Sequence, residues 1–176
     1  VAALSNTTSL IPNPTVSYTS ANSTGTLFYT PVSNASGSAL ILVRVEDGGL
    51  DGNLSTSNDN AFRNRIFSVT VNPVNDDPTI TAISNRTVSE DAESQTVSLS
   101  GITAGGGESQ PLSVGVTSGD SDLILINSVS YESASSTGSF VYTPVADASG
   151  STSITVLVTD GGQDGNLSTA NGNGTT

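Results

Sequence analysis

The stretch STGTLFYTPVSNASGSALILVRVEDGG, residues 23–49, decides the fold, because a close copy, STGSFVYTPVADASGSTSITVLVTDGG, occupies residues 136–162. At the same sequence offset, the segment 1–63 aligns without a gap with the segment 114–176. Identical residues occupy 34 of the 63 aligned positions. A period of this length is too long for one turn of a solenoid and suits one β-sandwich. The sequence therefore predicts a repeated domain.

Both copies show the two-residue periodicity of β-strands. Ile41, Val43 and Val45 alternate with the residues between them, and the same three residue types recur at positions 154, 156 and 158. Alternation that is rich in β-branched residues is typical of half-buried antiparallel strands. The turn sequences NASG, DASG, DGG, DGN and TAGGG separate these runs, and no segment shows helical spacing. We predict an all-β chain.

The repeat boundaries do not coincide with the ends of the sequence. The stretch NPVNDDP, residues 72–78, is the expected linker, so one domain covers residues 1–77 and the next covers 78–176. Residue 1 corresponds to Val114, so the first domain lacks its opening strands, and the second lacks a copy of RIFSVTVNP, residues 65–73. Since unpaired sheet edges attract other strands, either the chain continues beyond both ends or a neighbouring molecule supplies the strands.

The composition excludes several classes of protein. Sixteen acidic residues against four arginines and no lysine give a formal net charge of −12, which disfavours nucleic acid and anionic membrane surfaces. The absence of Cys and His removes thiol nucleophiles, Ser-His-Asp triads and ordinary zinc sites. No run of 18 apolar residues occurs, so no membrane span is expected. We predict a non-enzymatic protein with a surface that favours cations.

Residues 42–80, LVRVEDGG…LSTSND…IFSVTVNPVNDDPTI, resemble the end of a cadherin-like repeat. Such repeats run from a V-x-D-x-G turn through a last strand into an N-D-N-x-P linker. The stretch ITAISNRTVSEDAE, residues 80–93, resembles the first strand of a following repeat, and SGITAGGGESQPLSV, residues 100–114, is similar to the cadherin-like and Ig-like tandem repeats of very large bacterial surface and secreted proteins. The resemblance implies tandem Ig-like antiparallel β-sandwiches outside the cell.

In such repeats, calcium lies between successive sandwiches. The resemblance implies calcium ligands at the linker, at the top of each domain and at the start of the second: Asn75, Asp76, Asp77, Asp160, Asp47 and Glu90. Calcium takes six to eight oxygen ligands, mostly carboxylates and carbonyls. The chain departs from the family pattern at Pro73, where the family has an aspartate, and at Pro78, which comes one residue early. The alternative is that NDDP is a solvated, extended linker and DGG a tight turn.

Several other motifs have a structural explanation. GGLDGNL, residues 48–54, does not recur every nine residues, so a hairpin turn is expected. The repeated oxygen donors also allow a loop-bound ion: Asp47, Asp51 and Asn53, and their copies Asp160, Asp164 and Asn166. The carboxylate pairs Asp120/Asp122 and Glu90/Asp91 lie in turns, and the chain has no Trp to line a sugar site. The glycine-rich TAGGGES, residues 103–109, lacks the lysine of a phosphate loop and is expected to be a flexible connection.

Seven Asn-x-Ser/Thr sequons are candidate glycosylation sites on exposed turns: Asn6, Asn22, Asn34, Asn53, Asn85, Asn166 and Asn173. Four tyrosines, Tyr18, Tyr29, Tyr131 and Tyr142, occupy equal places in the two copies and are expected in the core or at sheet edges.

Together these patterns predict an extracellular or cell-surface structural protein, a subunit of a filament, fibril or stalk with calcium-stiffened joints. Its expected partners are other copies of itself or adjacent repeats. An adhesin or carbohydrate-binding module of a larger secreted protein is the alternative, and an accessory domain of a secreted enzyme is a third class.

Overall fold

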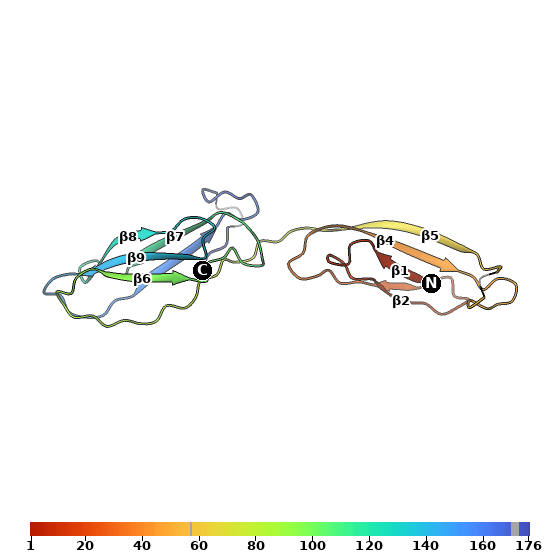
Figure 1. The fold of residues 1–176 in the computed structure, drawn as a ribbon, viewed down its shortest axis with the longest axis horizontal. Coiled ribbons are helices and arrows are strands. Elements are labelled where there is room, and N and C mark those ends of the chain that lie inside the picture. Colours follow the sequence, from red (N-terminus) through yellow and green to blue (C-terminus); the bar gives the residue numbers. More distant parts are fainter. Residues whose placement is uncertain (57, 170–172) are drawn as a thin grey trace. The chain divides into compact units, whose positions relative to one another are not determined.

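The computed structural model describes residues 1–56, 58–169 and 173–176, and within these ranges all regular secondary structure is β-strand (Figure 1). This confirms the predicted all-β class. The chain divides into two compact units, unit 1 (Val1–Pro73) and unit 2 (Val74–Thr176), and the division falls inside the predicted linker 72–78. The strands are β1 (Ala2–Ser5), β2 (Thr15–Ser17), β3 (Thr26–Phe28), β4 (Gly37–Glu46), β5 (Phe62–Val71), β6 (Gln95–Ser100), β7 (Leu112–Ser118), β8 (Ile124–Ser130), β9 (Thr137–Pro144) and β10 (Ile154–Asp160).

Unit 1 is built on the long antiparallel pair of β4 and β5. A three-stranded sheet has the order β1-β4-β5, and β2 and β3 form a separate antiparallel pair. The alternation of β4 buries Ala39 and Ile41, which form a small core with Leu10 and Ile11. Val69 and Val71 of β5 pack against this core from the neighbouring strand.

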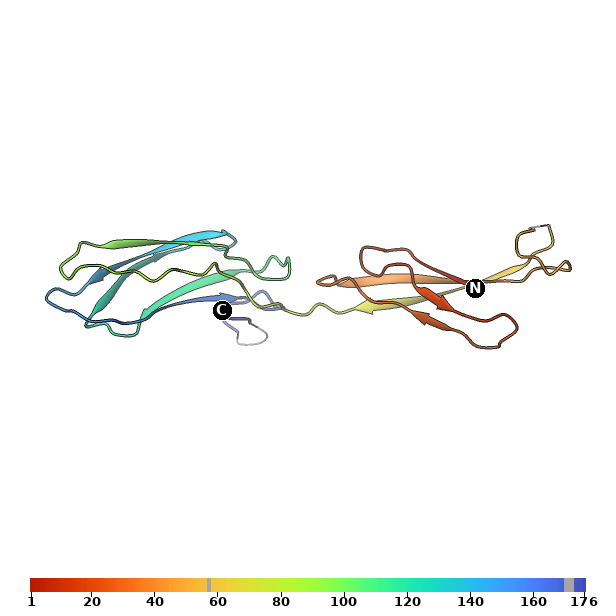
Figure 2. The same ribbon diagram turned by 90° about the horizontal axis from the view of Figure 1, so that it is seen from below.

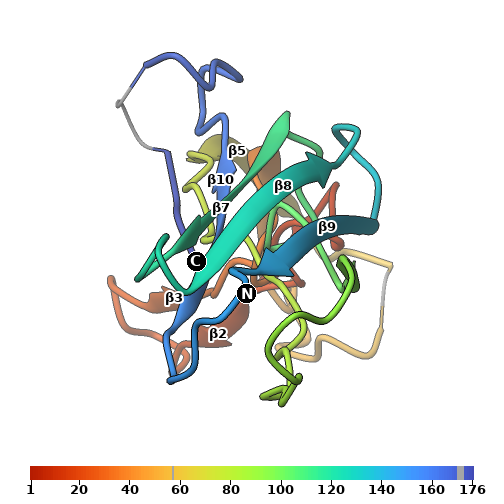
Figure 3. The same cartoon turned by 90° about the vertical axis from the view of Figure 1, so that its left-hand side faces the viewer.

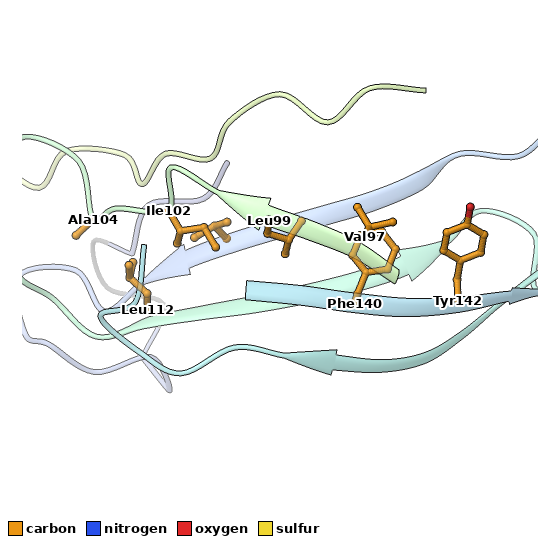
Figure 4. Close-up of a cluster of buried hydrophobic side chains, with 8 residues drawn as sticks. Val97, Leu99, Ile102, Ala104, Leu112, Phe140 and Tyr142 are labelled. Carbon is orange, nitrogen blue, oxygen red and sulfur yellow. The ribbon is translucent and has the colours of Figure 1, made fainter. Parts of the chain in front are cut away.

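Unit 2 holds two sheets around a larger core. One sheet has the order β6-β9-β8 and the other pairs β10 with β7, and all pairs are antiparallel. Figures 2 and 3 show β8 and β9 in one layer of this unit and β7 and β10 in the other. Both layers contribute to the core (Figure 4): Val97, Leu99, Ile102, Ala104, Leu112, Phe140, Tyr142 and Val158.

The strand register of unit 1 recurs in unit 2 at the sequence offset of 113. Ala2 of β1 pairs with Arg44 of β4, and their counterparts Gly115 and Leu157 pair between β7 and β10. All four pairs between β1 and β4, and all three between β2 and β3, recur in this way. The isolated bridge between Thr159 and Thr175 likewise repeats the pair of Glu46 and Phe62. The sequence repeat is thus also a repeat of strand pairing.

The two units differ in the burial of a repeated valine. Val158 is fully buried in unit 2, whereas its counterpart Val45 is 49% exposed in unit 1. Val158 belongs to the cluster that includes Val97 and Leu99 of β6, and the repeat offset places the counterpart of β6 before residue 1. In unit 1 a hollow of about 330 Å³, lined in part by Val43 and Val45, lies on this side of β4.

Proline explains why β2 is shorter than its counterpart β8. β8 begins at Ile124 and has a register irregularity between Ile126 and Ser128, whereas β2 begins at Thr15. The residues of unit 1 that correspond to Leu125 and Asn127 are Pro12 and Pro14. Because proline has no N–H to donate to a ladder, the first part of this strand does not form in unit 1.

Candidate functional site

Each Asp-Gly-Gly turn places an aspartate as a hydrogen-bond acceptor at the C-terminal end of a strand. In unit 1, Asp47 Oδ1 accepts from the backbone N–H groups of Gly49 (3.0 Å) and Ala61 (3.1 Å). In unit 2, Asp160 Oδ1 accepts from the corresponding groups of Gly162 (2.8 Å) and Gly174 (2.9 Å). Asp47 is exposed, but Asp160 has an exposed fraction of 0%. The same turn therefore holds a surface carboxylate in one unit and a buried one in the other.

The first glycine of each turn allows a close approach of two backbone segments. A Cβ atom on Gly48 would lie 2.7 Å from the carbonyl carbon of Gly52, and one on Gly161 would lie 2.8 Å from that of Gly165. Any side chain at these positions would force the loop apart, which explains glycine in both copies. The turn is thus a feature of the backbone that both repeats need in order to fold.

Asp160 is the centre of a polar cluster that we call the Asp160 network. The side-chain amide of Asn75 donates to both carboxylate oxygens of Asp160, at 3.3 Å each. Gln110 donates from Nε2 to Asn75 Oδ1 (2.6 Å) and to Glu108 Oε2 (2.9 Å). Glu108 Oε2 also accepts from the backbone N–H of Asp76, at 3.3 Å. The network joins the beginning of unit 2 to β10 and to the segment before β7.

The glycine-rich loop 105–107 packs directly against residues 76–77. A Cβ atom on Gly105 would overlap the backbone carbonyl of Asp77, and one on Gly106 would overlap the carboxylate of Asp76. Gly105 is buried, as is Ala104 before it. The loop that we expected to be only a connection therefore covers the predicted linker ligands.

Four of the six predicted calcium ligands, Asn75, Asp76, Asp77 and Asp160, lie in unit 2. Asn75 contacts Asp160, the backbone of Asp76 contacts Glu108, and Gly174 lies between Asp160 and Asp77. A Cβ atom on Gly174 would be 2.6 Å from Asp160 Oδ2 and 3.0 Å from Asp77 Oδ1.

The remaining two predicted ligands lie elsewhere. Asp47 belongs to unit 1, and Glu90 is exposed on the segment 83–90, where it lines a cleft rather than the Asp160 network. The predicted set is therefore not a single cluster within either unit.

Unpaired side-chain oxygens in unit 2 bear on the calcium prediction. Gln110 Oε1 and Asn173 Oδ1 are buried oxygens that have no hydrogen-bond partner in the described part of the chain. The unpaired oxygen of Asn173 is a repeated feature of this loop, because Oδ1 of its counterpart Asn60 in unit 1 also has no partner. Within the described ranges, however, no three acidic side chains lie close enough together to hold a metal ion. Calcium binding thus stays a prediction from the resemblance, with the unpaired oxygen of Gln110 beside it.

Sequence reasoning missed Glu108 and Gln110, which link Asn75 and Asp76 to the rest of unit 2. Both lie in a part of the repeat that has no copy in residues 1–63, so comparison of the copies gives no signal. The only signal in the sequence was that Glu108 and Gln110 lie within four residues of Leu112, where β7 begins.

Each loop after the Asp-Gly-Gly turn is closed by its own side chains. Asp51 accepts from the backbone N–H of Asn53 and from the hydroxyl of Thr56. Asp164 accepts from the backbone N–H of Asn166 (2.9 Å) and from the hydroxyl of Thr169 (2.7 Å). These contacts account for the repeated Asp-Gly-Asn sequence as a hydrogen-bonded turn, which supports the hairpin-type interpretation over a loop-bound ion.

Two carboxyl groups of the unit 1 loop, those of Asp47 and Asp51, are expected to have pKa values below the ordinary one. The backbone N–H groups of Ala61 and Gly49 lower the pKa of Asp47 below its ordinary value of 3.8. The hydroxyl of Thr56 and the N–H of Asn53 do the same to the pKa of Asp51. Because both folded-state pKa values are depressed, the stabilisation is present above pH 3.8 and is lost as the pH falls through the folded values.

An NMR titration of the side-chain carboxyl carbons checks this expectation. Both midpoints should lie below 3.8, and Thr56→Val should raise the midpoint of Asp51 while leaving that of Asp47 in place. A midpoint for Asp51 at or above the ordinary value would show that its hydroxyl contact does not form in solution.

The two carboxylate pairs in turns also make structural hydrogen bonds. Asp120 Oδ1 accepts from the backbone N–H of Asp122, at 2.9 Å. Asp91 Oδ1 accepts from the backbone N–H of Asp147, at 3.1 Å. These hydrogen bonds therefore support a structural role for the two carboxylate pairs.

The tyrosines differ in exposure between the two copies, whereas most sequon asparagines are exposed. Six of the seven sequon asparagines are exposed, and only Asn173 is half-buried. Tyr18 and Tyr29 are 40% and 42% exposed, whereas Tyr142 is 3% exposed in the core of unit 2. Tyr18 and its counterpart Tyr131 each donate their hydroxyl to a backbone carbonyl four residues later, at 3.1 Å. The tyrosines of unit 2 are thus more deeply packed.

Comparison of the chain with known protein families, with curated proteins and with solved structures finds no match. The described residues contain no helix with the length and apolar character that a membrane span requires.

Proposed function

We propose that the chain is part of an extracellular, non-enzymatic structural protein in which tandem Ig-like, cadherin-like β-sandwiches form a surface filament, fibril or stalk. The repeated register supports this proposal, because two units of the same chain use the same strand pairs at one constant sequence offset. Tandem repetition of one domain sets the length of a protein through the number of domains. Its partners are adjacent repeats or other copies of the chain.

The surface composition suits exposure outside the cell. The chain has no lysine and four arginines, so proteases that cleave after basic residues have few sites. Six exposed sequon asparagines provide attachment points for glycans if the source has the enzymes. A net charge of −12 keeps chains apart in solution unless specific contacts or cations join them.

Negative-stain electron microscopy of the purified chain at rising concentration tests the filament proposal. We expect linear assemblies with a regular axial repeat, because unpaired strands at the ends favour contacts between copies. Particles that remain dispersed at every concentration, with and without calcium, would contradict assembly by this chain. Saturable binding to a defined oligosaccharide would instead support the carbohydrate-binding alternative.

The proposal includes a calcium ion held near the Asp160 network, supported by the buried, unpaired oxygen of Gln110 and by the carboxylates of Asp76 and Asp77. When bound, calcium would neutralise these carboxylates and restrain residues 75–77. Extracellular calcium modules bind with dissociation constants of about 0.1–1 mM.

A melting experiment with calcium checks this part of the proposal. At about 5 mM calcium, mass action predicts that the melting temperature of unit 2 rises by about 5 °C relative to chelator. Asp77→Asn should abolish most of the shift, and Asp120→Asn, in a turn that does not belong to the network, should retain it. An unchanged melting temperature for the unsubstituted chain would remove calcium from the proposed function.

A further inference from the structure

The outer face of the sheet β1-β4-β5 in unit 1 carries apolar side chains that the core does not use. β4 turns Ile41 into the core, so its alternation places Leu40 and Leu42 on the opposite face. The register sets Leu42 between Leu4 of β1 and Ile66 of β5. Leu4, Leu40 and Ile66 are 54%, 46% and 61% exposed, and Leu42 is half-buried. We call these four residues the outer apolar patch.

The corresponding face of unit 2 is polar at the matching positions. At the repeat offset, Leu4, Leu40 and Leu42 are replaced by a threonine, a serine and a threonine. Both units use the same strand pairs here, so the fold does not require leucine at these positions. A sheet face that is only solvated carries polar side chains. The outer apolar patch is therefore a property of unit 1 that the shared fold leaves unexplained.

The negative charge of the chain is concentrated away from this patch. Unit 1 has four acidic residues and three arginines, a net charge of −1, whereas unit 2 has twelve acidic residues and one arginine, a net charge of −11. Beside the patch, Arg44 pairs with Glu46 at 3.2 Å and lies 4.0 Å from the ring centroid of Phe62. Because this pair has no net charge, two acidic chains can approach each other at the patch with little repulsion.

We propose that the outer apolar patch is a self-association surface, on which the same patch of a second copy of the chain packs. Two sheets that pack face to face keep their strand directions within about 30° of each other. With a two-fold axis along β4, Leu40 and Leu42 of the two copies meet at the centre. Leu4 of each copy then faces Ile66 of the other. The inference rests on the part of the proposed function that takes other copies as partners, and it names the surface that they use.

The charges of the face favour a second copy over a strongly charged partner. In this two-fold arrangement the Arg44–Glu46 pairs of the two copies lie next to each other, so each guanidinium gains a second carboxylate as acceptor. An acidic or basic partner would meet a face whose charges already neutralise each other. β4 has 10 residues and is about 33 Å long, so the contact falls at the low end of specific interfaces, which bury about 1,000 Å² or more. We therefore expect weak, reversible association.

Sedimentation velocity of the full chain at rising concentration, with a calcium chelator present, tests this inference. We expect a reversible equilibrium between monomer and dimer. Leu40→Asp with Ile66→Asp should weaken it by about tenfold or more, because each contact would bury unpaired carboxylates. Leu50→Asp with Leu54→Asp adds the same charge to unit 1 at loop positions that are 99% and 62% exposed, and it should retain the dimer.

A second variant changes the patch without adding charge. Leu40→Ser with Leu42→Thr introduces the residues that unit 2 has at the matching positions, which the repeated sheet already accommodates. It should weaken the dimer while unit 1 keeps its protection in amide hydrogen exchange. Retained dimerisation in this variant would contradict the inference.

Cross-linking locates the contact, since the chain has no cysteine of its own. Packed sheets lie about 10 Å apart, a distance that a short bismaleimide can bridge. Leu40→Cys should give cross-linked dimers, and Leu54→Cys, in the exposed loop, should give few. Dimers that cross-link through Leu54→Cys and not through Leu40→Cys would overturn the inference.

Salt separates this contact from one between the arginines of one copy and the acidic surface of another. Higher salt shortens the Debye length and screens the repulsion between two chains of charge −12. The dissociation constant should therefore fall several-fold when NaCl is raised from about 0.05 M to about 0.5 M. Monomers at every concentration, association that weakens with salt, or equal losses for the two pairs of aspartate substitutions would overturn the inference. Filaments are scored separately by microscopy, so their absence contradicts the proposed function and leaves the dimer measurement intact.

Discussion

Asp160→Ala is expected to destabilise unit 2 by about 3–5 kcal/mol, because two buried backbone N–H groups lose their acceptor at about 1–3 kcal/mol each. These N–H groups belong to Gly162 and Gly174, and the side-chain amide of Asn75 loses its contact with Asp160 as well. Asp160→Asn keeps one oxygen as an acceptor for the N–H groups, so we expect a smaller loss. The measurement is denaturant-induced unfolding, monitored by amide hydrogen exchange in peptides from β7 and β10.

The chain contains a matched control for this variant. Asp47 accepts the same two backbone hydrogen bonds in unit 1, but its carboxylate is exposed, so water can replace it when it is removed. Asp47→Ala should therefore destabilise unit 1 much less than Asp160→Ala destabilises unit 2. If both variants lose the same free energy of unfolding, the hydrogen bonds of the turn determine the destabilisation, and the burial of Asp160 does not.

Val158→Ala is expected to destabilise unit 2 by about 2–3 kcal/mol through lost burial of methyl groups and the cavity left behind. Val158 is fully buried among residues of β6, β7 and β9. For a domain of this size, such a loss lowers the melting temperature by roughly 10 °C or more. Calorimetry of the full chain, with exchange data to assign each transition to its unit, measures the effect.

Val45→Ala is the control at the same position of the other repeat. Val45 is 49% exposed, so its truncation should cost no more than about 0.5 kcal/mol. A second control adds residues 78–113 before Val1, which supplies unit 1 with the opening segment of the repeat. In that extended chain, Val45→Ala should approach the cost of Val158→Ala. If Val45→Ala still costs no more than about 0.5 kcal/mol in the extended chain, the added segment does not cover Val45, and the hollow has another cause.

The all-β class could be predicted because it depends on local alternation. The period-two pattern at 41–45 and 154–158 became part of β4 and β10. The register also followed the sequence offset, since residues that correspond in the alignment make corresponding pairs. These features need only the sequence near each strand.

Burial could not be predicted from the repeat, because it depends on residues outside the aligned copies. Val45 and Val158 are identical in type and position, and only β6 and its neighbours distinguish them. The same applies to Asp47 and Asp160. The polar residues that bind the linker, Glu108 and Gln110, precede β7 in a region that occurs once in the chain. Long-range contacts of this kind leave no periodic signal in the sequence.

The shared register of the two units also affects how the chain reaches its folded state. A strand such as β4 carries the same Ile-x-Val-x-Val pattern as β10, so during folding each can pair with the other's neighbours in a geometry close to the native one. Tandem domains with similar sequences are prone to such exchanges, which trap chains in misassembled states. Some corresponding positions carry different residues in the two copies, such as Arg44 in β4 and Leu157 in β10. These differences favour pairing of each strand with the neighbours of its own unit. Sequence divergence between adjacent repeats thus protects the chain against kinetic trapping while the pairing geometry stays constant.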